Sequence, residues 1–188
     1  TTAHTLSLHD ALPICEPVVY PSTEARFSSK YGSGFTWKAA APEIDLAEPS
    51  IILDSLETSE GITSYSLQIT PNRKINRLEL FAPRDLNFET FSVNQLTAGD
   101  VQLGENSFNI HTKRGHHRLL TWQVSGRDRL QIEFSLASDQ NPEFTLYEAS
   151  YDLLENEQLD VPLRDATMIP RPFVLNDAII FKKSISFE

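Results

Sequence analysis

Cysteine is almost absent from this chain, in which Cys15 is the only one among 188 residues. A single cysteine allows no disulfide within the chain, so the sequence excludes a scaffold held together by disulfides. Long hydrophobic runs are missing too, because no apolar stretch approaches the roughly 20 residues that a membrane-spanning helix needs. The sequence therefore predicts a fold that depends on its hydrophobic core.

Positive charge is also scarce. The chain has 16 Lys and Arg residues against 26 Asp and Glu residues, which gives a net charge of −10 at pH 7. This sign repels nucleic-acid phosphates and anionic lipid head groups, so we expect no nucleic-acid partner and no direct membrane insertion. With 40% hydrophobic residues, the composition is ordinary for a folded domain and unlike that of a disordered chain.

The first 15 residues resemble a translated DNA adapter. The string TCC CTA CAC GAC GCT CTT CCG ATC, which resembles a common short-read sequencing adapter, translates without mismatch into residues 7–14, SLHDALPI. A secretory signal would need a basic start and an uninterrupted apolar run, and this stretch has neither. We therefore interpret residues 1–15 as an artefactual peptide that is not part of the fold. Cys15, His4 and His9 then carry no functional argument.

Excluding this peptide leaves 173 residues (188 less 15), which is enough for one domain with a sizeable core. We also expect the genuine chain to begin inside a gene, so that further segments of a longer protein lie upstream. Glu188 fits a natural C-terminus.

Residues 16–49 are predicted to form a proline-rich connecting segment. Prolines at this density disfavour both long helices and central strands. Aromatic residues in the segment indicate that it packs on the domain. The prolines are Pro17, Pro21, Pro42 and Pro49, and the aromatic residues are Phe27, Tyr31, Phe35 and Trp37.

From residue 50 onward the hydrophobic pattern has a period of two, which is typical of half-buried strands. The clearest case is 130–136, where Leu, Ile and Phe alternate with Gln, Glu and Ser. The pattern predicts strands over 64–70, 75–82, 88–93, 108–111, 119–124, 130–136, 144–150 and 179–187. We expect an all-β domain over 50–188: an antiparallel, jelly-roll-like β-sandwich with proline-rich connecting segments.

Two segments of this domain are not predicted to be strands. Residues 151–158 are expected to form at most one short turn, and no amphipathic helix is predicted. Residues 160–177 contain three prolines and form a loop longer than compact domains usually have. We expect this loop either to pack across a sheet or to have a function.

Three histidines near residue 115 are candidate metal ligands. His111, His116 and His117 lie among three basic residues (Lys113, Arg114 and Arg118), which oppose a divalent cation. Adjacent residues of a strand also point to opposite faces, so His116 and His117 do not converge. A zinc site needs three or four converging ligands, and we therefore predict a solvated hairpin tip.

Carboxylate pairs such as Glu155/Glu157 or Asp152/Glu155 are expected by chance in so acidic a chain. Calcium loops, phosphate-binding glycine loops and serine-elbow motifs are absent. The sequence predicts no catalytic, cofactor-binding or metal-ligating residue. Trp37 and Trp122 leave a carbohydrate-binding or adhesion module open as an alternative, although the apolar neighbours of Trp122 favour a place in the core.

Three blocks of the sequence point to a family. They are FSSKYGSGFT (residues 27–36), ITPNRKINR (residues 69–77) and IPRPFVLNDA (residues 169–178). Together they resemble the C-terminal region of bacterial membrane-bound di-zinc aminopeptidases, which are similar in layout to vacuolar membrane proteases and the endoplasmic-reticulum metallopeptidase. The resemblance covers residues 16–188 in order, and none of its blocks is a chemical motif.

The resemblance implies a β-rich accessory domain on the extracytoplasmic side of the membrane. Its partners would be an upstream peptidase domain with two zinc ions and a set of transmembrane helices. The zinc ligands and catalytic carboxylate of the family have no matching positions here, so we expect this chain to bind no cofactor and to be inactive by itself. The segments 27–37 and 160–177 are the expected contact surfaces.

Overall fold

A computed structural model describes residues 5–7, 43–99, 101–108, 117–124, 129–159, 161, 163, 165–168 and 177–187. These residues form strands and turns and no helix. Accordingly, none of them belongs to a helix long and apolar enough to cross a membrane. The backbone contacts divide the chain into two compact units, one of Thr1–Leu46 with Ala149–Phe181 and one of Ala47–Glu148 with Lys182–Glu188.

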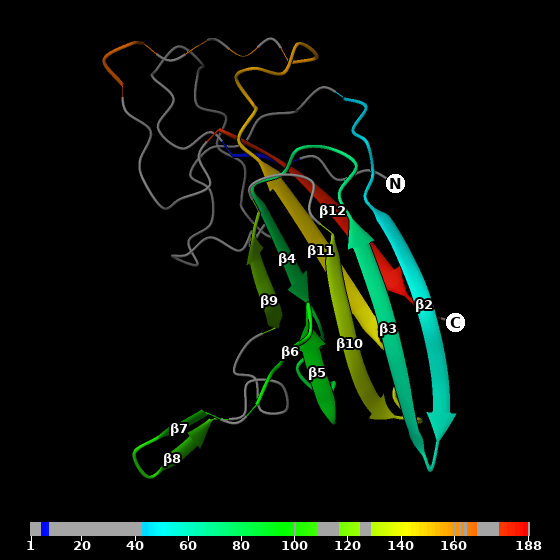
Figure 1. The fold of residues 1–188 in the computed structure, drawn as a ribbon. Helices are drawn as coiled ribbons and strands as arrows, with labels where there is room; N and C mark the ends of the chain where they lie inside the picture. The colour runs from blue at the N-terminus through cyan, green and yellow to red at the C-terminus, as the bar shows by residue number, and fades with distance from the viewer. Residues whose placement is uncertain are drawn as a thin grey trace, which may run out of the picture. The chain divides into compact units, whose positions relative to one another are not determined.

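Most strands belong to two antiparallel five-stranded sheets (Figure 1). The first sheet has the order β1-β12-β11-β4-β9 and the second has the order β2-β3-β10-β5-β6, while β7 and β8 form a separate hairpin. The predicted all-β antiparallel sandwich is thereby confirmed. The strands are β1 (Thr5–Ser7), β2 (Ser50–Ser59), β3 (Ile62–Thr70), β4 (Arg77–Phe81), β5 (Thr90–Val93), β6 (Leu96–Thr97), β7 (Val101–Leu103), β8 (Asn106–Phe108), β9 (Arg118–Gln123), β10 (Leu130–Ala137), β11 (Glu143–Ser150) and β12 (Ala178–Ser186).

The strand order refines the topology that was expected. The neighbours β2-β3-β10 and β12-β11-β4 correspond to strands A-B-E and G-F-C of immunoglobulin-type sandwiches. Alternation along a strand identifies its buried face but not its neighbours, and so it left the order of the strands undetermined.

Tight hairpins fix the register at two places in the second sheet. Glu60 and Gly61 join β2 to β3 and both have positive φ, 52° and 80°. Asn94 and Gln95 join β5 to β6 with φ of 48° and 68°. Two consecutive residues of this kind are typical of type I′ turns, whose twist matches that of the strands they connect.

The core of the larger unit is an aromatic layer between the two sheets. Phe134 on β10 stacks on Tyr65 of β3 with ring centroids 4.7 Å apart. It also meets Phe144, on β11 of the other sheet, edge to face at 5.4 Å. Phe88, which precedes β5, lies 5.6 Å from Phe134, again edge to face. Each such pair contributes about 1 kcal/mol beyond the burial of its surface.

The smaller unit has an apolar cluster of its own, in which Leu153, Leu159 and Ile179 are buried. The side-chain amide of Gln158 forms two hydrogen bonds with the backbone of Asp45, as the backbone of a neighbouring strand would. Its Oε1 accepts a hydrogen bond from Asp45 N at 2.9 Å, and its Nε2 donates to Asp45 O at 3.1 Å. This pair of bonds holds the segment before Pro49 beside the turns that follow β11.

Seven of the eight predicted strands match observed strands to within about three residues, and the eighth overlaps β8 only at Phe108. Residues 109–111 lie outside the described part of the chain. The strand β2 was not predicted, because Ile51, Ile52 and Leu53 are consecutive and do not alternate with polar residues. The short strands β6 and β7 carry too few residues to show any period.

The short strand β1 pairs with β12, with Thr5 opposite Ile180 and Ser7 opposite Ala178. It lies within the segment that we interpret as adapter-derived. An open strand edge accepts almost any extended segment, because the ladder uses backbone groups. The predicted limits between 1–15, 16–49 and 50–188 stay predictions, since residues 8–42 lie outside the described part of the chain.

Deleting residues 1–15 is expected to leave the fold intact. The pairing of β1 involves three residues at the edge of a sheet, so the free energy of unfolding should change by less than about 1 kcal/mol. Urea unfolding followed by circular dichroism measures this change. As a control, deleting residues 182–188 removes the core residues Ile185 and Phe187 and should abolish cooperative unfolding. A similar loss in the 1–15 deletion would show that this segment belongs to the fold.

Candidate functional site

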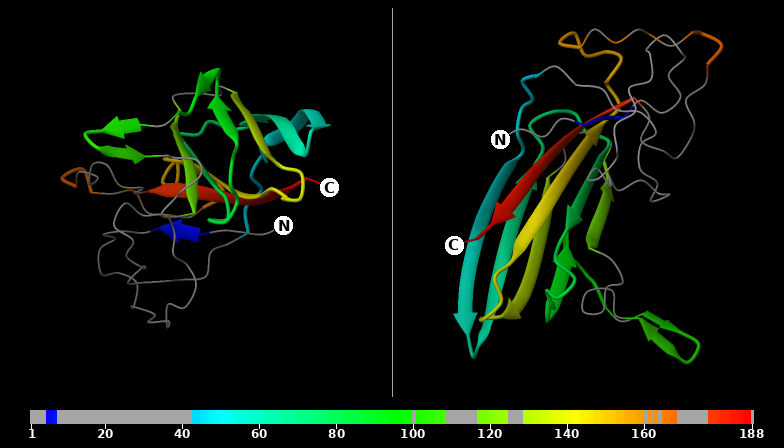
Figure 2. Two further views of the ribbon diagram at one scale, coloured as in Figure 1. Left: turned by 90° about the horizontal axis from the view of Figure 1, so that it is seen from below. Right: turned by 180° about the vertical axis from the view of Figure 1, so that it is seen from behind.

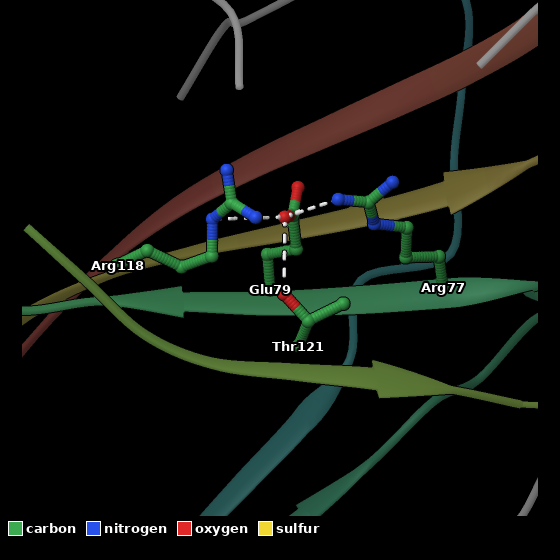
Figure 3. Close-up of polar contacts among 4 residues, drawn as sticks. All are labelled: Arg77, Glu79, Arg118 and Thr121. Carbon is green, nitrogen blue, oxygen red and sulfur yellow. Dashed lines mark hydrogen bonds and ion pairs between the residues drawn. The ribbon is translucent and has the colours of Figure 1, made fainter. Parts of the chain in front are cut away.

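A group of charged side chains surrounds Glu79 on the outer face of the first sheet (Figure 3). Along β4, Leu78 and Leu80 are fully buried in the core, so alternation places Glu79 between them on the opposite face. Thr121 is the residue opposite Glu79 on the neighbouring strand β9. The outer face of β4 and β9 therefore positions this group.

Three donor groups converge on one oxygen of Glu79. Its Oε1 lies 2.5 Å from Arg77 Nη2 and 3.4 Å from Arg118 Nε, and it accepts a hydrogen bond from Thr121 Oγ1 at 3.3 Å. The side chain of Glu79 is only 2% exposed, whereas that of Arg118 is 36% exposed. A carboxylate that has lost this much hydration is stable only when paired charges and hydrogen bonds replace the water.

The chemistry of the Glu79 group is that of an ion-pair network. A general acid or base must reach the proton of a substrate, but Glu79 is buried and held by two guanidinium groups. The group joins β4 to β9 through the ion pair with Arg118 and the hydrogen bond from Thr121.

An aromatic pair lies on the same face. Phe81 and Tyr147 meet edge to face, with ring centroids 5.3 Å apart and planes at 78°. Lys182 Nζ lies 5.8 Å from the centre of the Tyr147 ring. Both rings are half-buried, and their perpendicular planes do not form the flat platform on which a sugar ring stacks. Tyr151 is the one exposed aromatic residue among the described side chains.

A second buried carboxylate lies at the end of β11. Glu148 follows Phe144 and Leu146 on the face that points into the core, and it is fully buried. Arg73 Nη2 donates a hydrogen bond to the main-chain oxygen of Glu148 at 3.2 Å, and Arg73 Nε lies 3.8 Å from Glu148 Oε2. Among the described residues, no donor forms a hydrogen bond with either carboxyl oxygen.

This environment favours the protonated form of Glu148. Burial raises the pKa of Glu148 from 4.5 to about 7, because the charged form loses its hydration. The positive charges of Arg73 and Lys183 lower the same pKa, but less strongly. Lys183 is itself paired with Glu48, whose Oε2 lies 2.7 Å from Lys183 Nζ. Glu148 therefore changes its charge near neutral pH.

Those candidate residues from the sequence that the structure describes do not meet at a site. His117 is exposed and its main-chain oxygen accepts a hydrogen bond from Ala82 N at 2.9 Å, while His111 and His116 lie outside the described residues. Glu155 and Glu157 are exposed in the turns after β11. In the part of the chain that the structure describes, no three His, Cys, Asp or Glu side chains lie together as metal ligands would.

The turn predicted over 151–158 is present as two successive turns, which Glu155 N→Asp152 O and Leu159 N→Asn156 O close at 3.1 and 2.9 Å. Trp122 is partly buried and packs against the core, as its apolar neighbours predicted. Trp37 lies outside the described residues, as do most of the segments 27–37 and 160–177.

Neither Glu79 nor Glu148 was singled out from the sequence. For Glu148 a signal was present, since it continues the alternation of Phe144 and Leu146 and so takes a core-facing position. For Glu79 there was none, because a charged residue on the outer face of a strand is ordinarily exposed. No protein-family model and no curated protein matches the chain.

Replacing Glu79 with glutamine should destabilise the protein. The Glu79→Gln variant leaves Arg77 and Arg118 without a carboxylate, and breaking such a buried pair costs about 3 kcal/mol. Urea unfolding at neutral pH measures the loss. Glu143→Gln is the matched control, because Glu143 is exposed at the start of β11 and its replacement should change stability by less than about 0.5 kcal/mol. Equal effects in the two variants would contradict a buried network.

Stability is expected to depend on the charge of Glu148. A carboxyl group whose pKa is higher in the folded state stabilises the fold fully below its unfolded pKa, near 4.5, and this contribution is lost as pH rises through about 7. Glutamine mimics the protonated group, so Glu148→Gln should match the unmodified protein at pH 4.5. At pH 8 the variant should be the more stable by on the order of 3 kcal/mol. Unfolding in urea across this range tests the crossover, and a constant difference between the two proteins contradicts it.

Proposed function

We propose that this chain is the non-catalytic C-terminal accessory domain of a membrane-bound zinc aminopeptidase and lies on the extracytoplasmic side. The longer protein would hold the transmembrane helices and a peptidase domain with two zinc ions. Within it, this domain packs against the peptidase domain, and it stabilises that domain or restricts access to its cleft. The resemblance of residues 16–188 to this family and the all-β fold support the proposal.

The observation that carries the proposal is the structural role of the block at residues 69–77. This block forms the end of β3, the turn and the start of β4. Asn72 Nδ2 donates a hydrogen bond to Glu48 O at 2.7 Å, Arg73 binds the main chain at Glu148, and Arg77 pairs with Glu79. A resemblance that contains no chemical motif is expected in a domain whose matching residues hold the architecture together.

The alternative, a secreted carbohydrate-binding or adhesion module, has less support. A sugar-binding face needs exposed, coplanar aromatic rings, whereas Phe81 and Tyr147 are perpendicular and half-buried. Trp122 packs against the core, where it is not available as a platform. The described aromatic residues therefore favour an accessory role, in which they stabilise the domain.

Removing residues 16–188 from the longer protein should lower both its expression and its turnover of peptides, because the peptidase domain loses a packing partner. Membrane-fraction immunoblots and hydrolysis of an aminoacyl-4-nitroanilide measure the two quantities. Phe134→Ala, which opens the core of this domain by an estimated 3–5 kcal/mol, should reproduce part of the loss. Glu143→Gln is the control and should have no effect. Unchanged expression and turnover in the deletion would refute the accessory role.

A further inference from the structure

Strand β2 is an open edge of the second sheet. It runs for ten residues, Ser50–Ser59, and pairs with β3 on one side only. No strand of the described residues pairs with its other side, and β2 lies at the margin of the sheet in Figure 1 and in the rear view of Figure 2. An edge of this length presents a row of backbone donors and acceptors to another chain.

The edge also presents apolar side chains. Ile52, Leu53 and Leu56 are 46%, 38% and 51% exposed. The register shifts between Leu53 and Ser55, so that Leu53 lies opposite Leu67 and Leu56 opposite Tyr65. Both partners on β3 are core residues. The irregularity therefore keeps Leu53 and Leu56 on the inner face of the sheet, where they extend the apolar interior to the margin of the sandwich.

The hairpin of β2 and β3 carries only negatively charged side chains. Residues 39–72, which include this hairpin, contain six acidic residues and no Lys or Arg. Two of these, Asp54 and Glu57, are exposed on β2 itself. If two copies of β2 paired antiparallel with Asp54 of each opposite Glu57 of the other, like charges would meet, which opposes pairing. The charge of the edge fits a basic partner and disfavours a second copy of this chain.

We propose that β2 binds an extended peptide segment in which apolar residues alternate with Lys or Arg, by adding it as a further strand to the second sheet. Backbone hydrogen bonds to the free side of β2 would supply affinity, as in other cases of strand addition. Apolar side chains of the segment contact Leu53 and Leu56, and its basic side chains meet Asp54 and Glu57. The inference concerns this chain by itself and holds for either candidate function.

The test uses the full 188-residue chain and a fluorescein-labelled peptide of ten alternating Val and Lys residues. Fluorescence anisotropy at low salt should detect binding, and amide signals of residues 50–59 should shift in the NMR spectrum. Glu57→Lys should weaken binding about tenfold, since it turns an attraction into a repulsion. Glu143→Lys is the matched control: it makes the same charge change at an exposed position on the other sheet and should leave the affinity unchanged. The same peptide with all its backbone amides N-methylated keeps its lysines but has no backbone N–H donors, so it should not bind.

Several outcomes would overturn the proposal. If Glu57→Lys and Glu143→Lys weaken peptide binding equally, the binding is due to non-specific charge attraction. Absence of binding at millimolar peptide would exclude strand addition. A dimer in sedimentation experiments that Leu56→Ser abolishes would make a second copy the occupant. Because Glu57 is exposed, its replacement should leave the circular dichroism spectrum unchanged, so the test stands even if Leu56→Ser unfolds.

Discussion

The contact between Phe134 and Phe144 is the interaction on which the sandwich depends. The two rings belong to different sheets and meet edge to face at 5.4 Å, so this pair joins the layers directly. Tyr65 and Phe88 surround Phe134 and complete an interior that excludes water. Unpaired polar groups are costly in such a layer, so almost all the described charged residues lie outside it, and Glu148 on the core face of β11 is the exception.

The two buried carboxylates, Glu79 and Glu148, lie in different environments. Glu79 pairs with two arginines and a hydroxyl group, and it contributes to stability through those pairs. Glu148 lies on the core face, where Arg73 binds mainly its backbone, so loss of hydration dominates. The first arrangement joins β4 to β9. The second makes stability sensitive to pH around neutrality.

The sequence predicted where most of the strands lie, but it did not predict which strands pair with one another. Alternation located β3, β10 and β11 because their buried residues recur at every second position. It missed β2, whose apolar residues are adjacent and whose register shifts at Asp54. The order of the strands depends on contacts between distant segments, such as β4 with β9, which no local pattern encodes. For the same reason the pairing of Glu79 with Arg118 was invisible, although the core-facing position of Glu148 could have been found.

The position of Phe187 and Ile185 has a consequence for biosynthesis. Both residues belong to the last strand and its end, yet Phe187 contacts Tyr65 and Phe144 in the interior. The ribosome releases these two residues after the other residues of this core, so the aromatic layer closes only once they have been made. Until then Tyr65 and Phe144 remain accessible to chaperones and to other incomplete chains. Truncation before Ile185 would therefore leave the interior incomplete.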